Sequence, residues 1–285
     1  MGNRTFVNIL LGLVIIILAG YLIYTHGDRP AGPAYTAIDP ASINRITIKR
    51  RNKPQIVLAK TGKGWWLEQP FRVHANPMRI HSILQLMRTA GNSPFTARDP
   101  ELQQLGLGDD ALTLLLNDHK FVFGNTDPIS DARYLRYGDT VYLIEDDLYF
   151  QLRQGPAFFA GTRLIPETAQ IIQLTFPRLT LIREGGRWTS IPARTASNDK
   201  AALLAERWKN AEATVVNPAS AFDSLGTVTV HLKDEVPITL DVVSLAPTLV
   251  LARSDLGIQY FMGNYKPEHL GLENLAAKTN ESSPP

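Results

Sequence analysis

The stretch "TGKGWWLEQP", residues 61–70, predicts the fold of this chain because "REGGRWTSIP", residues 183–192, repeats its pattern. In both stretches a glycine turn precedes tryptophan, and a proline follows a few residues later. The chain holds only four tryptophans, so a second copy of such a phrase is informative. The repetition indicates that a structural module occurs twice in the chain.

A helix is predicted at the same distance after each phrase. Asn76 before Pro77 is typical of a helix N-cap with proline in the first helical position. Asn198 is the predicted N-cap of the second helix. Trp66 precedes Asn76 by ten residues, and Trp188 precedes Asn198 by ten as well. On this spacing Trp66 and Trp188 are equivalent residues of the module core, and Trp65 is an additional one.

Short apolar runs separated by turn residues predict strands on both sides of each helix. In the first copy they are "INRITIKR", "QIVLAK" and "WWLEQP", then "ALTLLL", "KFVFG", "RYLRYG" and "TVYLIE". In the second copy they are "AQIIQLTF", "LTLIRE" and "RWTSIP", then "TVTVHL", "PITLDVV", "TLVLAR" and "IQYFMG". Strands in hairpin-linked runs pair in antiparallel fashion. The predicted fold class is α+β, with two modules that each carry an antiparallel sheet and one main helix.

The segment before the modules is strongly apolar. "FVNILLGLVIIILAGYLIY", residues 6–24, has Asn8 as its only strongly polar residue. A helix of this length matches the hydrocarbon thickness of a bilayer, and Tyr21 and Tyr24 lie where interfacial aromatics are expected. A single uncleaved transmembrane helix is therefore predicted, with a cleaved signal peptide as the alternative. The following residues are expected outside the cytoplasm, in the periplasm of a Gram-negative bacterium.

These patterns predict six consecutive regions. They are a membrane anchor (1–24), a Pro- and Gly-rich linker (25–42), the first module (43–154), a connection (155–168), the second module (169–275) and a disordered tail (276–285).

Composition narrows the function. A net charge of +2 gives no electrostatic footprint for nucleic acid. The chain has no cysteine, which excludes disulfides, thiolate metal sites and a cysteine nucleophile. It contains no nucleophile elbow, phosphate-binding loop or dinucleotide fingerprint. We therefore expect no catalytic residues, no cofactor and no metal, and His74 and His81 lack the spacing of a metal pair.

Two sets of residues are candidates for contact with a ligand or partner. Trp65 is the candidate for stacking on a sugar ring, although core packing is the favoured interpretation of the tryptophans. The cluster "KRRNK" contributes Lys49, Arg50, Arg51 and Lys53, which form either a solvated turn or a contact with anionic headgroups.

The connection between the two modules has two interpretations, and so do the acidic residues of the first module. Phe158 and Phe159 in "GPAFFAG" are expected to be buried between the modules, with a partner surface as the alternative. Asp127 and Asp131 are expected to form a turn rather than an acid–base or calcium site. The acidic residues 145–147 are expected to begin a helix.

The order of these motifs resembles the family called domain of unknown function 4340. The matching residues are Ile46 and Ile48, Gly64 to Leu67 with Pro70, "LGLGDDALTLLL", Gly124, and Tyr134-Leu135-Arg136. The second copy departs from the pattern, since "TLVLAR" lacks the tyrosine. The resemblance implies an envelope protein with one membrane anchor, in some members associated with ABC transporters of the gliding-motility type. It implies no catalytic residues.

Three classes of function follow from the sequence. The favoured one is a non-enzymatic accessory or scaffold protein in the bacterial inner membrane, which binds another envelope protein such as an ABC transporter subunit. The alternatives are a module that binds glycan or lipid headgroups, and an enzyme of unrecognised type.

Overall fold

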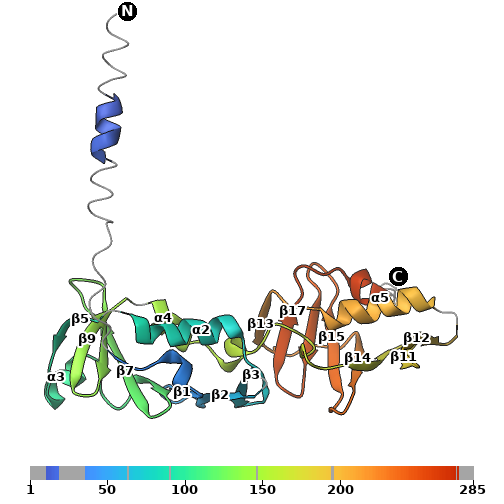
Figure 1. The fold of residues 1–285 in the computed structure, drawn as a ribbon, viewed down its shortest axis with the longest axis horizontal. Coiled ribbons are helices and arrows are strands. Elements are labelled where there is room, and N and C mark those ends of the chain that lie inside the picture. The colour runs from blue at the N-terminus through green and yellow to red at the C-terminus, as the bar shows by residue number, and fades with distance from the viewer. Residues whose placement is uncertain are drawn as a thin grey trace, which may run out of the picture.

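A computed structural model describes residues 11–18, 36–62, 64–89, 91–145, 147–193, 196–273 and 275. It contains two antiparallel sheets that follow each other along the chain, with few helices (Figure 1). The predicted α+β class and antiparallel pairing are confirmed. The predicted tail, residues 276–285, lies outside the described residues, as do residues 25–35 of the predicted linker.

The first sheet has the strand order β4-β3-β2-β1-β6-β7-β8-β9-β5. Its strands are β1 (Arg45–Lys49), β2 (Ile56–Thr61), β3 (Gly64–Gln69), β4 (Val73–His74), β5 (Asn92–Phe95), β6 (Leu112–Leu116), β7 (His119–Thr126), β8 (Arg133–Tyr137) and β9 (Thr140–Ile144). Alternate residues of these strands point into one core because side chains in a strand alternate between its faces.

Helices cover both faces of the first sheet. On one face lie α2 (Pro77–Gln85), the 3₁₀ turn η2 (Leu86–Arg88) and α4 (Asp147–Leu152), whose apolar residues join the main core of this module. On the other face α3 (Asp99–Gln104) packs Leu102 against Val122 and Val141. The helix expected after the acidic residues 145–147 is therefore present as α4.

The second sheet has the strand order β12-β11-β10-β14-β15-β16-β17-β13. Its strands are β10 (Ile171–Phe176), β11 (Leu179–Glu184), β12 (Arg187–Ile191), β13 (Val215–Pro218), β14 (Gly226–Leu232), β15 (Ile238–Ser244), β16 (Val250–Arg253) and β17 (Ile258–Phe261). One long helix, α5 (Asn198–Lys209), covers its inner face, and η4 (Pro267–Leu270) follows the last strand. Trp208 of α5 is fully buried and donates its indole N–H to the Leu270 carbonyl at 3.0 Å.

The two sheets share one topology. Without β4, the first sheet has the order β3-β2-β1-β6-β7-β8-β9-β5, and the second has the order β12-β11-β10-β14-β15-β16-β17-β13. Strand by strand, the chain follows the same path through both sheets. In each module the short strand after the helix pairs with the last strand. The sequence patterns missed these two strands, because "NSPF" and "VVNP" contain proline and lack an alternating pattern. The first module adds β4, which has no counterpart among the described residues of the second.

The register corrects the predicted equivalence of the tryptophans. Trp65 pairs with Lys60 next to the hairpin pair Thr61–Gly64, and Trp188 pairs with Arg183 next to the hairpin pair Glu184–Arg187. Trp65, not Trp66, is therefore the counterpart of Trp188. Both tryptophans are partly buried against the core of their own module, whereas Trp66 points to the opposite face.

The second helix also begins one residue earlier than predicted. Ser197, not Asn198, is its N-cap, and its hydroxyl accepts a hydrogen bond from the Lys200 N–H at 3.4 Å. Trp65 and the N-cap Asn76 are eleven residues apart, whereas Trp188 and Ser197 are nine apart. One of the two extra residues of the first module lies at the bulge in β3, and the other lies in the loop, which spans residues 70–75 after β3 and residues 192–196 after β12.

The connection between the sheets is bonded to both modules. Its 3₁₀ turn η3 (Pro156–Phe159) is followed by Gly161, whose N–H bonds to the His74 carbonyl at 2.7 Å. Two bonds then lead to the second module, from the Leu164 N–H to the Ala211 carbonyl at 3.1 Å and from the Ala213 N–H to the Thr162 carbonyl at 2.8 Å.

The predicted membrane segment lies mostly outside the described residues. Residues 11–18 are helical, and residues 1–10 and 19–35 are not described. Within the described ranges no helix is both long enough and apolar enough to cross a bilayer.

Candidate functional site

Trp65 lies in a shallow hollow on the helix-covered side of the first module. It contacts the core of that module and lines a hollow of about 190 Å³ together with Ile43, His81, Leu84 and Arg88. Trp65 therefore has the packing role that the sequence assigned to Trp66, and part of its ring faces the hollow.

Trp66 lies on the opposite face and contacts polar side chains. Its ring stacks on His74, which pairs with it across β3 and β4, with 3.8 Å between ring centroids. The Arg72 guanidinium lies 4.8 Å from the Trp66 ring centroid. The His74 imidazole and the Arg72 guanidinium thus cover the Trp66 ring and leave it little free surface for stacking on a sugar.

The basic cluster forms a turn between β1 and β2, and its two arginines differ in their partners. Arg50 donates hydrogen bonds to the carbonyls of Pro54 (3.2 Å), Arg153 (3.4 Å) and Gln154, so it binds the turn to the end of α4. Burial lowers the pKa of Arg50. Arg51 instead pairs with Asp110 at 3.2 Å, with both side chains exposed.

The two lysines of this cluster are exposed, as Arg51 is. Lys49 lies on β1 and lines, with Asp109, Asp110 and Lys120, a polar hollow of about 340 Å³. Lys53 is exposed in the turn. Arg50 of the cluster is therefore bonded within the protein, whereas the other basic side chains face solvent. The nearby carboxylates of Asp109 and Asp110 reduce the positive charge that the cluster presents to an anionic surface.

Phe158 and Phe159 pack inside the connection. Phe159 is fully buried in the core of the first module, and Phe158 is partly buried against the same core with the Arg79 guanidinium 3.9 Å from its ring centroid. Both rings therefore hold the connection against the first module, in the core of that module rather than between the two modules as the sequence predicted.

The carboxylates of the 127–131 loop stabilise a turn. Asp127 accepts hydrogen bonds from the Ser130 N–H (2.9 Å), the Ser130 hydroxyl (2.6 Å) and the Tyr134 hydroxyl (2.8 Å). These bonds lower the pKa of Asp127, the Ser130 hydroxyl contributing most. Asp131 has a positive φ of 57° within the turn. Among the described residues no group of three His, Cys, Asp or Glu side chains is placed to hold a metal ion.

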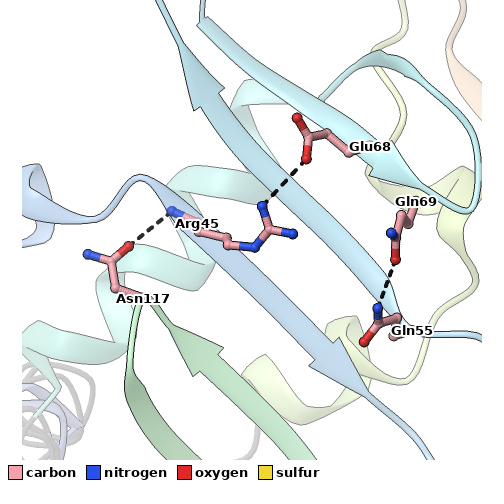
Figure 2. Close-up of polar contacts among 5 residues, drawn as sticks. All are labelled: Arg45, Gln55, Glu68, Gln69 and Asn117. Carbon is pink, nitrogen blue, oxygen red and sulfur yellow. Dashed lines mark hydrogen bonds and ion pairs between the residues drawn. The ribbon is translucent and has the colours of Figure 1, made fainter.

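The face of the first sheet opposite α2 carries polar side chains that bind one another. Figure 2 shows Arg45 of β1 reaching Glu68 of β3 across β2, with 3.6 Å between their charged atoms. Gln55 and Gln69 form a second pair at 2.8 Å, and Asn117 accepts from the Arg45 N–H at 3.1 Å (Figure 2). Around β1 to β3 the side chains on this face are therefore polar and bind one another.

A groove lies beside α5 in the second module. This groove, here called the α5 groove, has a volume of about 520 Å³ and runs between α5, the β10–β11 turn and the segment around η4. Its apolar lining is Phe176, Leu179, Leu203, Leu204, Leu272 and Leu275. Leu203 is 52% exposed, which is high for a leucine beside a core. A volume of this size is typical of a binding site.

Charged side chains surround the apolar lining of the α5 groove. Arg178, Lys200 and Arg207 come from the β10–β11 turn and one side of α5, and Glu268 and Glu273 come from the opposite wall. The groove therefore offers an apolar floor between a basic wall and an acidic one. Such a surface suits a segment that carries apolar side chains and charges of both signs.

The sequence patterns did not find this groove. Its lining comes from three segments around residues 176–179, 196–207 and 268–275, which lie together only in the folded chain. The one local signal is Leu203, which breaks the amphipathic pattern of α5 by placing a leucine on the exposed side.

The fold is that of an α+β protein built from two sheet modules that share one strand path apart from β4, with a groove beside α5 in the second module. The chain belongs to the family described as domain of unknown function (DUF4340), whose model matches residues 65–241. The match begins in β3 and ends in β15, so it spans the connection and parts of both sheets. No curated protein and no solved structure matches the chain.

Proposed function

We propose that this chain is a single-pass, membrane-anchored accessory protein of the bacterial envelope, whose two modules face the periplasm and bind another envelope protein. A subunit of an ABC-type transporter is the partner class that we propose. Its role is to hold or position that partner, and it performs no chemistry itself.

The anchor is the first part of this proposal. The apolar run of residues 6–24 has the length of a bilayer span, and the two tyrosines near its end suit the membrane interface. An anchor confines the modules near the membrane, which raises their effective concentration for a membrane-bound partner.

The observation that carries the proposal is the α5 groove. It combines exposed Leu203 and an apolar floor with walls of opposite charge, which is the composition of a protein-binding surface rather than of a reaction centre. Binding of sugar is less well supported, because Trp65 packs on the core and Trp66 is stacked on His74.

Site-specific crosslinking in native membranes tests the proposal. Full-length chain carrying photoreactive benzoylphenylalanine at Leu203 is expected to form one discrete adduct with another membrane or envelope protein on illumination. The same photoreactive residue at Val236, which is 84% exposed in the same module, is the control and is expected to form none.

A charge change distinguishes specific docking from chance proximity. Lys200→Glu combined with Arg207→Glu reverses the basic wall of the groove and is expected to remove the Leu203 adduct. Lys233→Glu, on an exposed turn of the same module, is expected to leave it unchanged. An adduct that survives the double change, or that contains only lipid, would contradict the proposed function.

A further inference from the structure

In the first module, one stretch of chain lies between the β1–β2 turn and the start of α2. This stretch, residues 153–159, follows α4 and is here called the filling segment. Its first two carbonyls, those of Arg153 and Gln154, accept hydrogen bonds from the Arg50 guanidinium in the turn. The filling segment therefore begins against a cation of the β1–β2 turn.

The filling segment ends at the first turn of α2 with two aromatic rings. The Arg79 guanidinium lies 3.9 Å from the Phe158 ring centroid, and Phe159 is fully buried in the core of the module. The Phe159 carbonyl also accepts a hydrogen bond from the Asn76 N–H at 2.8 Å. The first module thus holds this segment with one cation at each end and an apolar core for the second ring.

The second module has a cation at each of the two equivalent positions. Arg79 and Lys200 each lie three residues after the N-cap of their helix. Arg50 and Arg178 each lie two residues after the last residue of their strand that pairs with the next strand of the chain. Arg178 and Lys200 are exposed and line the α5 groove. The groove therefore lies between the counterparts of the two cations that hold the filling segment.

The apolar floor of the α5 groove also has its counterpart in the first module. Three isoleucines there are fully buried in the core that contains Phe159, namely Ile48, Ile56 and Ile83. Their counterparts by strand register and helix position all line the groove and are, in the same order, Phe176, Leu179 and Leu204. Leu203 is 52% exposed at the helix position where the first module has the polar Ser82. Residues that line a groove in the second module thus belong to a closed core in the first.

The chain that follows the last strand differs between the two modules. In the first module α4 leads into the filling segment, whereas in the second module η4 leads to Leu275, which lines the groove. Residues 276–285 carry no aromatic side chain, so they do not offer a second aromatic pair. In a second copy of this chain, Phe158 and Phe159 are already packed in the core of its own first module.

We infer that the α5 groove binds a short segment of the envelope partner that carries two adjacent aromatic side chains, as the first module binds its own filling segment. This inference rests on the proposed function and names the part of the partner that is recognised. One ring lies against the Lys200 ammonium, and the second lies on the apolar floor of the groove. Arg178 donates hydrogen bonds to backbone carbonyls of the segment, as Arg50 does in the first module.

A synthetic copy of the filling segment is the probe for this site. It is the peptide Arg-Gln-Gly-Pro-Ala-Phe-Phe-Ala-Gly, residues 153–161, with a fluorescent label at its N-terminus. Fluorescence anisotropy with the purified full-length chain in lipid nanodiscs is expected to show saturable binding above the signal from empty nanodiscs. A peptide with alanine in place of both phenylalanines is expected to bind about tenfold more weakly or worse, because aromatic anchors supply most of the binding energy of such a contact.

Variants of the chain assign the binding to the α5 groove. Lys200→Ala removes the cation beside the first ring and is expected to weaken the binding by about threefold, whereas Lys200→Arg is expected to retain it because the cation is kept. Leu203→Ser removes apolar surface from the groove and is also expected to weaken the binding. Lys233→Ala, on an exposed turn of the same module, is the control and is expected to leave the binding unchanged.

A photoreactive form of the peptide maps the position of the first ring. It carries benzoylphenylalanine in place of the first phenylalanine, and it is expected to form its adduct within residues 196–207 of the full-length chain. The chain without residues 276–285 is expected to bind the labelled peptide with the same affinity as the full-length chain.

Four results would overturn the inference. They are no saturable binding, equal binding by the alanine peptide, an adduct in the first module, and binding that appears only after residues 276–285 are removed, which would show that the chain itself occupies the groove. None of these measurements needs the membrane partner. A failure here with an intact Leu203 adduct in native membranes would reject the aromatic segment and leave the proposed function standing. Binding of the peptide without that adduct would reject the proposed function alone.

Discussion

Arg50 and Arg51 are adjacent in the chain but have different roles in the structure. Arg50→Met removes three hydrogen bonds from a partly buried cation to the carbonyls of Pro54, Arg153 and Gln154. We expect it to lower the free energy of unfolding by about 2 kcal/mol, because bonds from charged donors are among the stronger ones. Arg51→Met breaks only an exposed pair with Asp110 and is expected to cost less than about 1 kcal/mol. Urea unfolding of the two variants measures the difference, and equal losses would contradict it.

Asp127 gives a pH dependence with a defined sign. Its pKa is lowered from the ordinary value of 3.8 by the bonds from Ser130 and Tyr134, so the folded state favours the carboxylate. The resulting stabilisation is present above pH 3.8 and is lost as the pH falls through the lower folded-state pKa. Asp127→Asn is therefore expected to lower the melting temperature at neutral pH, with the difference from wild type shrinking on acidification. Asp131→Asn, in the same turn, is the control, and a difference independent of pH would contradict this assignment.

At the scale of single elements, β7 and the segment that follows α3 approach each other closely at Gly124. A Cβ there would overlap the Leu105 carbonyl oxygen and lie 3.0 Å from the Leu107 side chain. Gly124→Ala is expected to destabilise the protein by about 1–3 kcal/mol, because the backbone at Leu105 has to move. Gly155→Ala adds its Cβ in open space and is the matched control. Thermal unfolding of both variants measures the effect, and an unchanged melting temperature for Gly124→Ala would contradict this close approach.

At the scale of the whole molecule, the two modules share apolar contacts in addition to the bonded connection. Phe71 and Val73 pack against both cores, and Ala157 and Phe159 of the same 3₁₀ turn belong to different cores. We expect a single calorimetric unfolding transition for the wild type. Phe71→Ala combined with Val73→Ala is expected to separate it into two transitions, since fewer contacts then couple the modules. Val236→Ala, on an exposed turn, is the control, and two transitions in the wild type would contradict the coupling.

The sequence by itself determined the repeated module, the antiparallel strands of each copy and the main helix after the third strand. These features follow from local periodicity, turn residues and helix caps, which act over a few residues. It also indicated that Phe159 is buried and that Asp127 belongs to a turn, because both signals are local.

Only the tertiary structure decided which tryptophan of the pair faces the core. A strand reverses all its side chains when its register shifts by one residue, and the turn and the bulge that set the register of β3 are not visible in the spacing between Trp66 and Asn76. The α5 groove was likewise beyond the sequence. The groove forms from segments far apart in the chain, which come together only when α5 and the segment around η4 pack beside the β10–β11 turn.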